Sequence, residues 1–224
     1  MISRWLKALG SNGGIRVRFS QHGEDAILHK KFDKKSGFYI DAGAYHPFRQ
    51  SNTARLWCSG WNGVNIDANP NSIKIFKKVR TRDTNLWGAI VSDEDAAKNQ
   101  TIELAFSSKI DLKGSVSKDL AAERNLSQTV DVPTLSLTNI VNEYAVAHDG
   151  DFDFLNVDIE GMDYQAISGI SNWKKLPSII AIETYGDGIR DVLANETTAL
   201  LEEIGYDYIY QIGMTSVYSR LKSI

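Results

Sequence analysis

Short apolar runs alternate with segments of helical spacing along almost the whole chain, and this alternation is the feature that most constrains the fold. The apolar runs predict strands at residues 37–42, 63–68, 85–92, 152–159 and 178–184. The helical segments lie at residues 51–60, 71–80, 136–147, 162–170 and 195–205, with Ser51 expected to cap the first of them. This order predicts βαβ units, which close onto a mostly parallel sheet with helices on both faces. The sequence therefore indicates an α/β fold.

The last two β-like runs, residues 206–212 and 216–221, are joined by only three residues. A connection this short has no room for a crossover helix, so we expect an antiparallel hairpin. A smaller β-like run lies at residues 100–108. Because the chain has no internal repeat and no linker rich in Pro, Gly or Ser, we expect one domain over residues 19–224, preceded by an N-terminal helical extension over residues 1–18.

The composition of the chain argues against several classes of protein. Apolar residues make up 42% of the sequence and charged residues 24%, which is ordinary for a globular protein and unlike a disordered chain. The net charge of −3 provides no basic field for nucleic acid. A single cysteine, Cys58, excludes an internal disulfide and fits a reducing, cytoplasmic setting.

The N-terminal residues have an amphipathic pattern of their own. Ile2, Trp5, Leu6 and Leu9 would share one face of a helix. This helix is interpreted as docking on its own domain, as making peripheral contact with a membrane surface, or as frayed. The sequence has neither an apolar run long enough to span a bilayer nor the core of a signal peptide, so we expect neither a membrane span nor export.

Carboxylates stand at the ends of four predicted strands, as Asp41, Asp67, Asp158 and Glu183. Each of them alone is explained by the turn-forming and capping roles of acidic residues. In an open parallel sheet, however, all four would emerge at the edge where ligands bind. Like charges crowded together destabilise a fold unless something neutralises or uses them. We therefore expect a ligand site at this edge of the sheet.

The turn after the first predicted strand contains Gly43 but departs from a dinucleotide-binding fingerprint. That fingerprint has a second glycine two residues later, where the backbone approaches the pyrophosphate, and this chain has Tyr45 there. NAD and FAD are therefore disfavoured. S-adenosylmethionine contains adenosine but no phosphate, so it needs only the turn and a carboxylate for the ribose hydroxyls. Asp67, at the end of the second predicted strand, stands where that carboxylate belongs.

Several motifs follow one another in a specific order. They are "FSQHGEDAIL", "YIDAGAYHP", "SNTARLW", "GWNGVNIDANPNSIKIF", "TRDTNLWGAIVSD", "DFDFLNVDIEGMDYQAISG" and "IIAIET". From Phe19 to Arg220 the chain resembles the FkbM-type methyltransferases, which depend on S-adenosylmethionine. The resemblance implies a class I methyltransferase fold, which is Rossmann-like, with a seven-stranded, mostly parallel sheet and a C-terminal antiparallel hairpin. It also implies O-methylation of a sugar, glycan or glycosylated metabolite, as in polysaccharide biosynthesis.

The resemblance further implies a cofactor site along the first three strand ends. Its residues would be Gln21, Glu24, Asp41, Gly43, Ala44, Ser51, Asn52, Asp67, Ala68, Trp87 and Ala89. The turn from Asp41 to Gly43 would lie along the methionine, Asp67 would hold the ribose, and the segment from Trp87 to Ala89 would flank the adenine. The chain departs from the family pattern at Asn156, where many members carry Lys, and at Trp87, where a small or acidic residue is frequent.

Methyl transfer to a hydroxyl requires that the oxygen is aligned with the methyl group and that its proton is removed. In one route a side chain acts as the general base, with Asp158 as the first candidate, Glu160 as the second and His46 as the third. In another route Asp158 and Glu183 bind Mg²⁺, which acidifies the hydroxyl. The sequence leaves both routes open.

A long polar stretch at residues 109–131 is interpreted either as an acceptor-binding flap, with Ser115 and Ser117 near the active site, or as a surface insertion. Two alternative functions share the expected fold. One is a catalytically silent binding module. The other is an NAD-dependent sugar-modifying enzyme, which Tyr45 disfavours, as does the absence of a Tyr-x-x-x-Lys pair at Tyr144, Tyr164 and Tyr185.

Overall fold

The computed structural model describes residues 18–32, 34–106, 128–186 and 188–220. Two predicted features lie outside these ranges, namely the N-terminal amphipathic helix and residues 109–127 of the predicted flap, which include Ser115 and Ser117. The division into an N-terminal extension and one domain therefore stays a prediction. Within the described ranges, no helix has both the length and the apolar character needed to cross a membrane.

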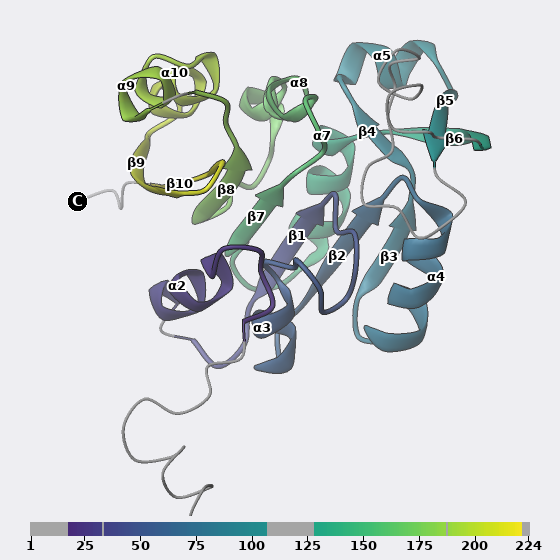
Figure 1. The fold of residues 1–224 in the computed structure, drawn as a ribbon, viewed down its shortest axis with the longest axis horizontal. Helices are drawn as coiled ribbons and strands as arrows, with labels where there is room; N and C mark the ends of the chain where they lie inside the picture. The colour runs from purple at the N-terminus through teal and green to yellow at the C-terminus, as the bar shows by residue number, and fades with distance from the viewer. Residues whose placement is uncertain (1–17, 33, 107–127, 187, 221–224) are drawn as a thin grey trace, which may run out of the picture.

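A seven-stranded sheet forms the centre of the described chain (Figure 1). Its strands, in spatial order, are β3 (Thr84–Trp87), β2 (Asn62–Asp67), β1 (Phe38–Ala42), β7 (Phe154–Val157), β8 (Ile179–Glu183), β10 (Thr215–Arg220) and β9 (Tyr206–Ile212). The first five strands run parallel, and β10 runs antiparallel to both of its neighbours. This order confirms the predicted class I methyltransferase fold with its C-terminal hairpin.

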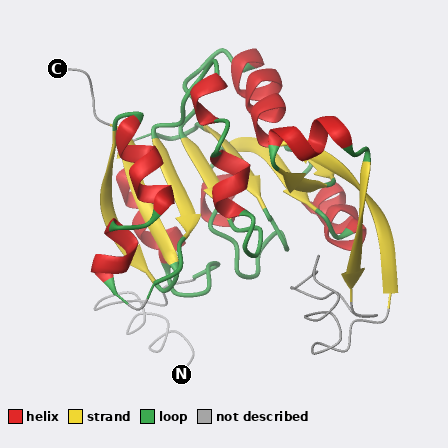
Figure 2. Cartoon of the chain, turned by 90° about the horizontal axis from the view of Figure 1, so that it is seen from above, coloured by secondary structure: helices red, strands yellow, loops and turns green. Residues whose placement is uncertain are grey.

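Helices cover both faces of the sheet (Figure 2). On one face, α2 (Glu24–Lys31) and α3 (Ala54–Cys58) pack through Leu28 and Leu56 against Tyr39 and Phe154. The other face is covered by α7 (Leu137–Ile140), a π-helix (Val141–Ala145), α8 (Asp163–Ile167), a 3-10 helix (Ile170–Asn172) and α10 (Glu196–Glu203), which α9 (Ile189–Leu193) precedes. Because both faces are covered, β1, β7 and β8 are buried along almost their whole length. This burial explains why these strands are mostly apolar in the sequence, with Asp41 in β1 and Asn156 in β7 as the buried polar exceptions.

Capping side chains define where several helices begin. Asn69 caps α4 (Pro70–Val79), which packs against β2 and β3, and Asn195 caps α10. The prediction that Ser51 caps the helix after β1 was wrong, because α3 begins after Thr53. The hydroxyl of Ser51 is used elsewhere, since it accepts a hydrogen bond from Arg80.

The strand predicted at residues 85–92 is divided into two strands at Gly88. β3 ends at Trp87 in the main sheet, whereas β4 (Ala89–Val91) pairs with β6 (Gln128–Ser136) in a second sheet of order β4-β6-β5. A Cβ at Gly88 would lie 2.4 Å from Cδ1 of Leu135, so the glycine lets the chain pass close to β6 as it changes sheets.

The second sheet also contains β5 (Thr101–Phe106), which confirms the β-like run predicted there, and α5 (Asp93–Lys98) connects β4 to β5. β6 was not predicted, and its first residues fall in the stretch read as a polar insertion. Pro133 lies within β6 and pairs with Thr101. Proline is unusual inside a strand, which is why the sequence pattern gave no strand signal at this position.

Candidate functional site

The register of the sheet places three of the four predicted carboxylates at one level. Ala42 pairs with Ile66 and Val157, and Val157 pairs with Ile182. The residues that follow these four are Gly43, Asp67, Asp158 and Glu183. They therefore share the carboxyl edge of the sheet, beside the switch between β1 and β7, where open α/β sheets bind their ligands.

Asp41 lies below this edge. It pairs with Asn65 and Asn156 inside the sheet and is buried. Its carboxylate accepts hydrogen bonds from Thr53 Oγ1 at 2.5 Å and from Asn156 Nδ2 at 2.9 Å. Burial raises the pKa of Asp41, while the positive charge of Arg80 acts in the opposite direction. The structure thus places this side chain beneath the site, and its direct contact with a cofactor stays a prediction.

The turn after β1 is held tightly between its neighbours. The backbone N–H groups of Gly43 and Ala44 both donate to the carbonyl of Ile66, at 3.0 and 2.9 Å. Gly43 has a φ of +80°, and a side chain there would collide with the backbone of Asp158. Both observations require glycine at this position. The turn is therefore fixed at the switch point between β2 and the loop after β7, and its contact with a cofactor stays a prediction.

Asp67 ends β2 and faces the same turn. Its carboxylate accepts hydrogen bonds from the backbone N–H groups of Tyr45 and Asn69, both at 2.7 Å. Tyr45 has a φ of +53°, a left-handed conformation that a bulky residue adopts only when its surroundings hold it. Burial raises the pKa of Asp67 to about 6, although both backbone hydrogen bonds act in the opposite direction. Asp67 thus fixes the start of the loop after β1 and lies at the edge, where it was predicted to bind a ribose.

Trp87 ends β3 and pairs with Asp67 at the end of β2. Its indole Nε1 donates to the carbonyl of Ala68 at 2.9 Å, which fixes the orientation of the ring, and 37% of the residue is exposed. Ala89, by contrast, is buried in β4 of the second sheet. The structure therefore brings Trp87 and Ala68 together at the edge where an adenine was expected, and places Ala89 behind them.

His46 acts as a cap within the loop after β1. Its Nδ1 accepts hydrogen bonds from the backbone N–H groups of Phe48, at 3.1 Å, and Arg49, at 3.2 Å. Desolvation lowers the pKa of His46, and the nearby charges of Arg49 and Arg80 lower it further. These contacts favour the neutral imidazole with its proton on Nε2. In that tautomer neither ring nitrogen is available to accept a proton from a substrate.

The other predicted residues of this loop point into the protein. Ser51 is buried, and its hydroxyl accepts a hydrogen bond from Arg80 at 2.9 Å. Asn52 donates from Nδ2 to Oδ1 of Asn156 at 2.8 Å. Their side chains therefore support the loop from beneath, and a direct contact with a cofactor stays a prediction for both.

The segment before α2 also reaches the carboxyl edge of the sheet. The backbone carbonyl of Phe19 accepts a hydrogen bond from Ser51 N, and the ring of His22 lies against Gly213 in the turn between β9 and β10. Gln21 is exposed there, whereas Glu24 is buried and accepts a hydrogen bond from the backbone of His22 at 2.8 Å. Glu24 thus shapes the segment, and Gln21 and His22 face solvent near the site.

The loop after β7 carries the candidate base. Asp163, a residue that the sequence did not single out, accepts hydrogen bonds from the backbone N–H groups of Ile159 and Gly161, both at 3.1 Å. Glu160 has a φ of +56°, so its backbone is held in an unfavourable conformation. Such strain is typical of functional loops and needs surrounding contacts to persist. The sequence signal that could have identified these hydrogen bonds was an acidic residue, Asp163, two positions after Gly161.

The electrostatics of this edge centre on Asp158. Its side chain is open to solvent but has protein atoms on many sides, and the resulting desolvation raises its pKa to about 8. The negative charges of Glu183, Asp163 and Glu160 raise it further in the same direction. Tyr185, another residue that the sequence did not identify, donates from its hydroxyl to Oε2 of Glu183 at 2.8 Å.

The metal route has less geometric support. No group of three or more His, Cys, Asp or Glu side chains within the described part of the chain is arranged to hold a metal ion. Asp158 and Glu183 do end adjacent strands, as predicted. A pair of carboxylates alone is below the ligand number that proteins usually give Mg²⁺ without a bound phosphate.

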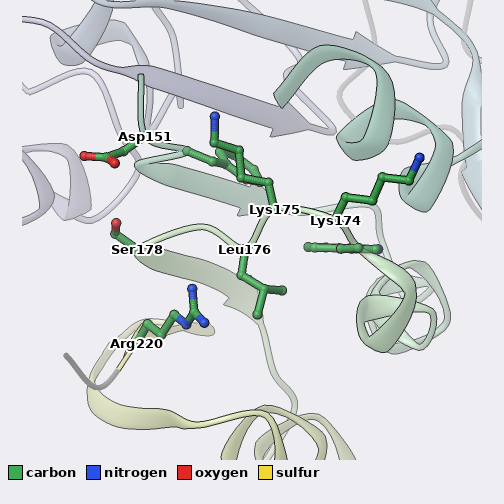
Figure 3. Close-up of a pocket in the computed structure, with 8 residues that line it drawn as sticks. Asp151, Lys174, Lys175, Leu176, Ser178 and Arg220 are labelled. Carbon is green, nitrogen blue, oxygen red and sulfur yellow. The ribbon is translucent and has the colours of Figure 1, made fainter. Parts of the chain in front are cut away.

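A hollow of about 470 Å³ lies at the opposite edge of the sheet, where β7 and β8 begin (Figure 3). Asp151, Lys174, Lys175, Leu176, Ser178 and Arg220 are among the residues that line it. The amino group of Lys175 donates to three backbone carbonyls, those of Ala145, His148 and Gly150. This lysine therefore holds the end of the π-helix segment, and the hollow is remote from the carboxylates described above.

Residues 41–208, from β1 into β9, match the methyltransferase FkbM domain. A TehB-like SAM-dependent methyltransferase from Corynebacterium glutamicum aligns at 13% identity and a TM-score of 0.44, over 98% of this chain and 96% of that one. Precorrin-6y C5,15-methyltransferase from Geobacter metallireducens aligns at 13% identity and a TM-score of 0.43, over 94% of both chains. No curated protein sequence matches significantly. The chain belongs to the FkbM methyltransferase family.

Proposed function

We propose that this protein is an S-adenosylmethionine-dependent O-methyltransferase whose acceptor is a hydroxyl of a sugar, glycan or glycosylated metabolite. The observation that carries the proposal is the position of Asp158. It follows β7 directly, lies against the Gly43 turn, and has a carboxyl group whose pKa is raised to about 8. A carboxyl group with this pKa is matched to proton transfer near neutral pH.

The residues of the edge fit a phosphate-free nucleoside cofactor. The Gly43 turn has no side chain and lies at the switch point, Asp67 offers carboxylate oxygens for ribose hydroxyls, and Trp87 offers an indole whose orientation is fixed by Ala68. Bound S-adenosylmethionine supplies an electrophilic methyl group on its sulfonium. Tyr45 stands where a dinucleotide fingerprint requires glycine, which supports this cofactor over NAD.

In the proposed reaction, the Asp158 carboxylate takes the proton of the acceptor hydroxyl as the oxygen forms its bond to the methyl group. Asp158 would thereby hold the proton that the acceptor loses as its oxygen displaces the thioether leaving group of the cofactor. His46 is less suited to this role, because both backbone hydrogen bonds to Nδ1 place its own proton on Nε2. Glu160 and Glu183 act on Asp158 through their charge, since both raise its pKa.

Some features remain predictions that accompany the proposal. A Mg²⁺ requirement through Asp158 and Glu183 is tested by comparing the rate in EDTA with the rate in added Mg²⁺. A cytoplasmic location, peripheral membrane contact through the N-terminal residues, and a role in polysaccharide biosynthesis rest on the sequence.

The proposal is tested by incubating the protein with S-adenosylmethionine and a panel of nucleotide sugars and oligosaccharides, followed by mass spectrometry. The expected result is a gain of one methyl group on one acceptor class. Asp158→Asn should lower the rate by about 10² to 10⁴ while the protein still binds S-adenosylhomocysteine. Asp151→Asn, at the opposite edge, is the control and should retain the rate. Cofactor binding with no methyl transfer to any hydroxyl would identify a silent binding module instead.

A further inference from the structure

Arg80 is a fully buried arginine beneath the proposed cofactor site. It follows α4, and its guanidinium makes five hydrogen bonds. Nη1 donates to Thr53 Oγ1 at 2.7 Å, Asn65 Oδ1 at 3.2 Å and Tyr39 OH at 3.2 Å, and Nη2 donates to Pro47 O at 2.5 Å and Ser51 Oγ at 2.9 Å. A buried charge is expensive unless hydrogen bonds compensate it. Both terminal nitrogens of Arg80 have such partners, whereas its Nε is buried without one among the described residues, so the contacts of the guanidinium are concentrated on the loop and strand that Nη1 and Nη2 face.

Two of these bonds hold the loop that follows the Gly43 turn. The carbonyl of Pro47 and the hydroxyl of Ser51 both belong to this loop, which runs from Tyr45 to Thr53. Within the loop, Tyr45 and Gln50 have φ values of +53° and +51°, which are unfavourable for side chains of this kind. Such conformations persist only where surrounding contacts hold them. Asp67 holds one end of the loop through Tyr45 N, and Arg80 holds its middle.

A third bond connects Arg80 to the strand that carries the turn. The hydroxyl of Thr53 accepts from Arg80 and donates to Oδ2 of Asp41. The other carboxylate oxygen of Asp41 accepts from Asn156, which in turn accepts from Asn52 of the same loop. Asn156 precedes Asp158 by two residues in the chain. The network therefore runs beneath both the cofactor turn and the strand that ends at the candidate base.

We infer that Arg80 is a positioning residue for methyl transfer, which acts through Thr53, Ser51 and Pro47 to hold the cofactor loop in its binding conformation. The inference rests on the proposed function, because it assumes that this loop and the Gly43 turn contact the cofactor. The planar guanidinium reaches five acceptors from one position, whereas a lysine ammonium has three donors and no fork. The network also gives Asn156 a role. Its amide accepts a hydrogen bond from Asn52 of the loop and donates one to Asp41 of β1. Asn156 stands at the position where the family resemblance leads one to expect lysine.

The test compares two buried threonines of equal exposure. Thr53→Val removes the hydroxyl that joins Arg80 to Asp41 while it conserves side-chain volume. Thr198→Val is the matched control, because Thr198 is also fully buried and its hydroxyl bonds to Val192 O at 2.6 Å and Tyr218 OH at 2.7 Å, away from the site. The dissociation constant for S-adenosylhomocysteine is measured by calorimetry for each variant, together with the temperature of unfolding.

We expect both variants to lower the unfolding temperature, but only Thr53→Val to weaken S-adenosylhomocysteine binding, by about tenfold. Arg80→Lys should weaken binding at least as much. Ser51→Ala removes one of the two loop acceptors of Arg80 and leaves the carbonyl of Pro47 in place, and it decides the question if the other variants do not fold. Binding by the folded Thr53→Val or Ser51→Ala variant equal to that of the unaltered chain would overturn this inference alone. Failure of the unaltered chain to bind the ligand would overturn the proposed function and this inference with it.

Discussion

A Cβ at Gly43 would lie 1.8 Å from the carbonyl oxygen of Asp158. The turn after β1 and the loop after β7 are therefore in backbone contact at the switch point of the sheet. This contact joins the proposed cofactor turn to the candidate general base, so a change at either residue should affect the other.

Gly43→Ala should destabilise the fold through both steric overlap and backbone strain. The overlap is with backbone, which cannot move aside as a flexible side chain would, and φ is +80°. We expect a loss of about 2 to 4 kcal/mol in the free energy of unfolding. Gly161→Ala is the matched control, because Gly161 has a φ of +93° but open space around its Cβ position. It should lose about 1 kcal/mol, from strain alone. Urea unfolding of both variants checks the difference, and equal losses would argue against the overlap.

His46→Asn should leave methyl transfer largely intact. The Oδ1 of asparagine can take the place of Nδ1 and accept the backbone N–H groups of Phe48 and Arg49, so the loop keeps its cap. We expect kcat/KM within about threefold of the unaltered chain, whereas loss of a general base would lower it by about 10² or more. His46→Leu, which cannot cap the loop, should instead raise the dissociation constant for S-adenosylhomocysteine. A large loss of rate in His46→Asn with normal cofactor binding would return His46 to the role of base.

The pH profile of the reaction should report Asp158. The ionised form is the base, and the pKa of its carboxyl group is raised to about 8 by desolvation and by the negative charges of Glu183, Asp163 and Glu160. The rate should therefore rise with pH and level off above about pH 8. Glu183→Gln removes one negative charge, which lowers the pKa of Asp158 and moves this rise to lower pH. Measurement of kcat/KM across this range checks the shift, with Glu203→Gln on the exposed face of α10 as control. A profile that Glu183→Gln leaves unmoved would contradict the assignment.

Trp87→Leu should weaken the binding of S-adenosylhomocysteine by about tenfold, because it removes a fixed aromatic face from the expected adenine position. Trp87→Phe should retain part of the affinity. Val146→Ala is a control at an exposed apolar residue away from this edge, since Val146 is 45% exposed and Trp87 is 37% exposed. Calorimetry on the three variants distinguishes an adenine contact from a surface aromatic residue. Equal affinities for Trp87→Leu and the unaltered chain would remove Trp87 from the cofactor site.

Much of the fold could be predicted because local patterns and chain connectivity define it. The strands β1, β7 and β8 are mostly apolar because both faces of the sheet are covered, and the three-residue connection before the last strand predicts a hairpin. The second sheet could not be predicted in the same way. β6 contains Pro133, and the break at Gly88 depends on how closely the chain approaches Leu135, a long-range contact.

The sequence by itself determined the class of the fold, the family, and the chemical types that meet at the carboxyl edge. It did so because strand periodicity, a single glycine after β1, and carboxylates at strand ends are all local properties of the chain. Only the tertiary structure decided which of these residues lie at the surface of the site. Sheet register sets Asp41 below Asp67 and Asp158, although all three follow the same pattern in the sequence.

The tertiary structure also decided the partners of residues far apart in the chain. Arg80 reaches Ser51 and Thr53, Asp163 braces the loop after Asp158, and the backbone of Phe48 and Arg49 occupies Nδ1 of His46. Hydrogen-bond partners and desolvation depend on distances in the folded chain, and no spacing in the sequence specifies them. The tertiary structure therefore shows what the first residues of the loop after Gly43 do: His46 caps the loop, and the backbone of Asp158 lies against the turn.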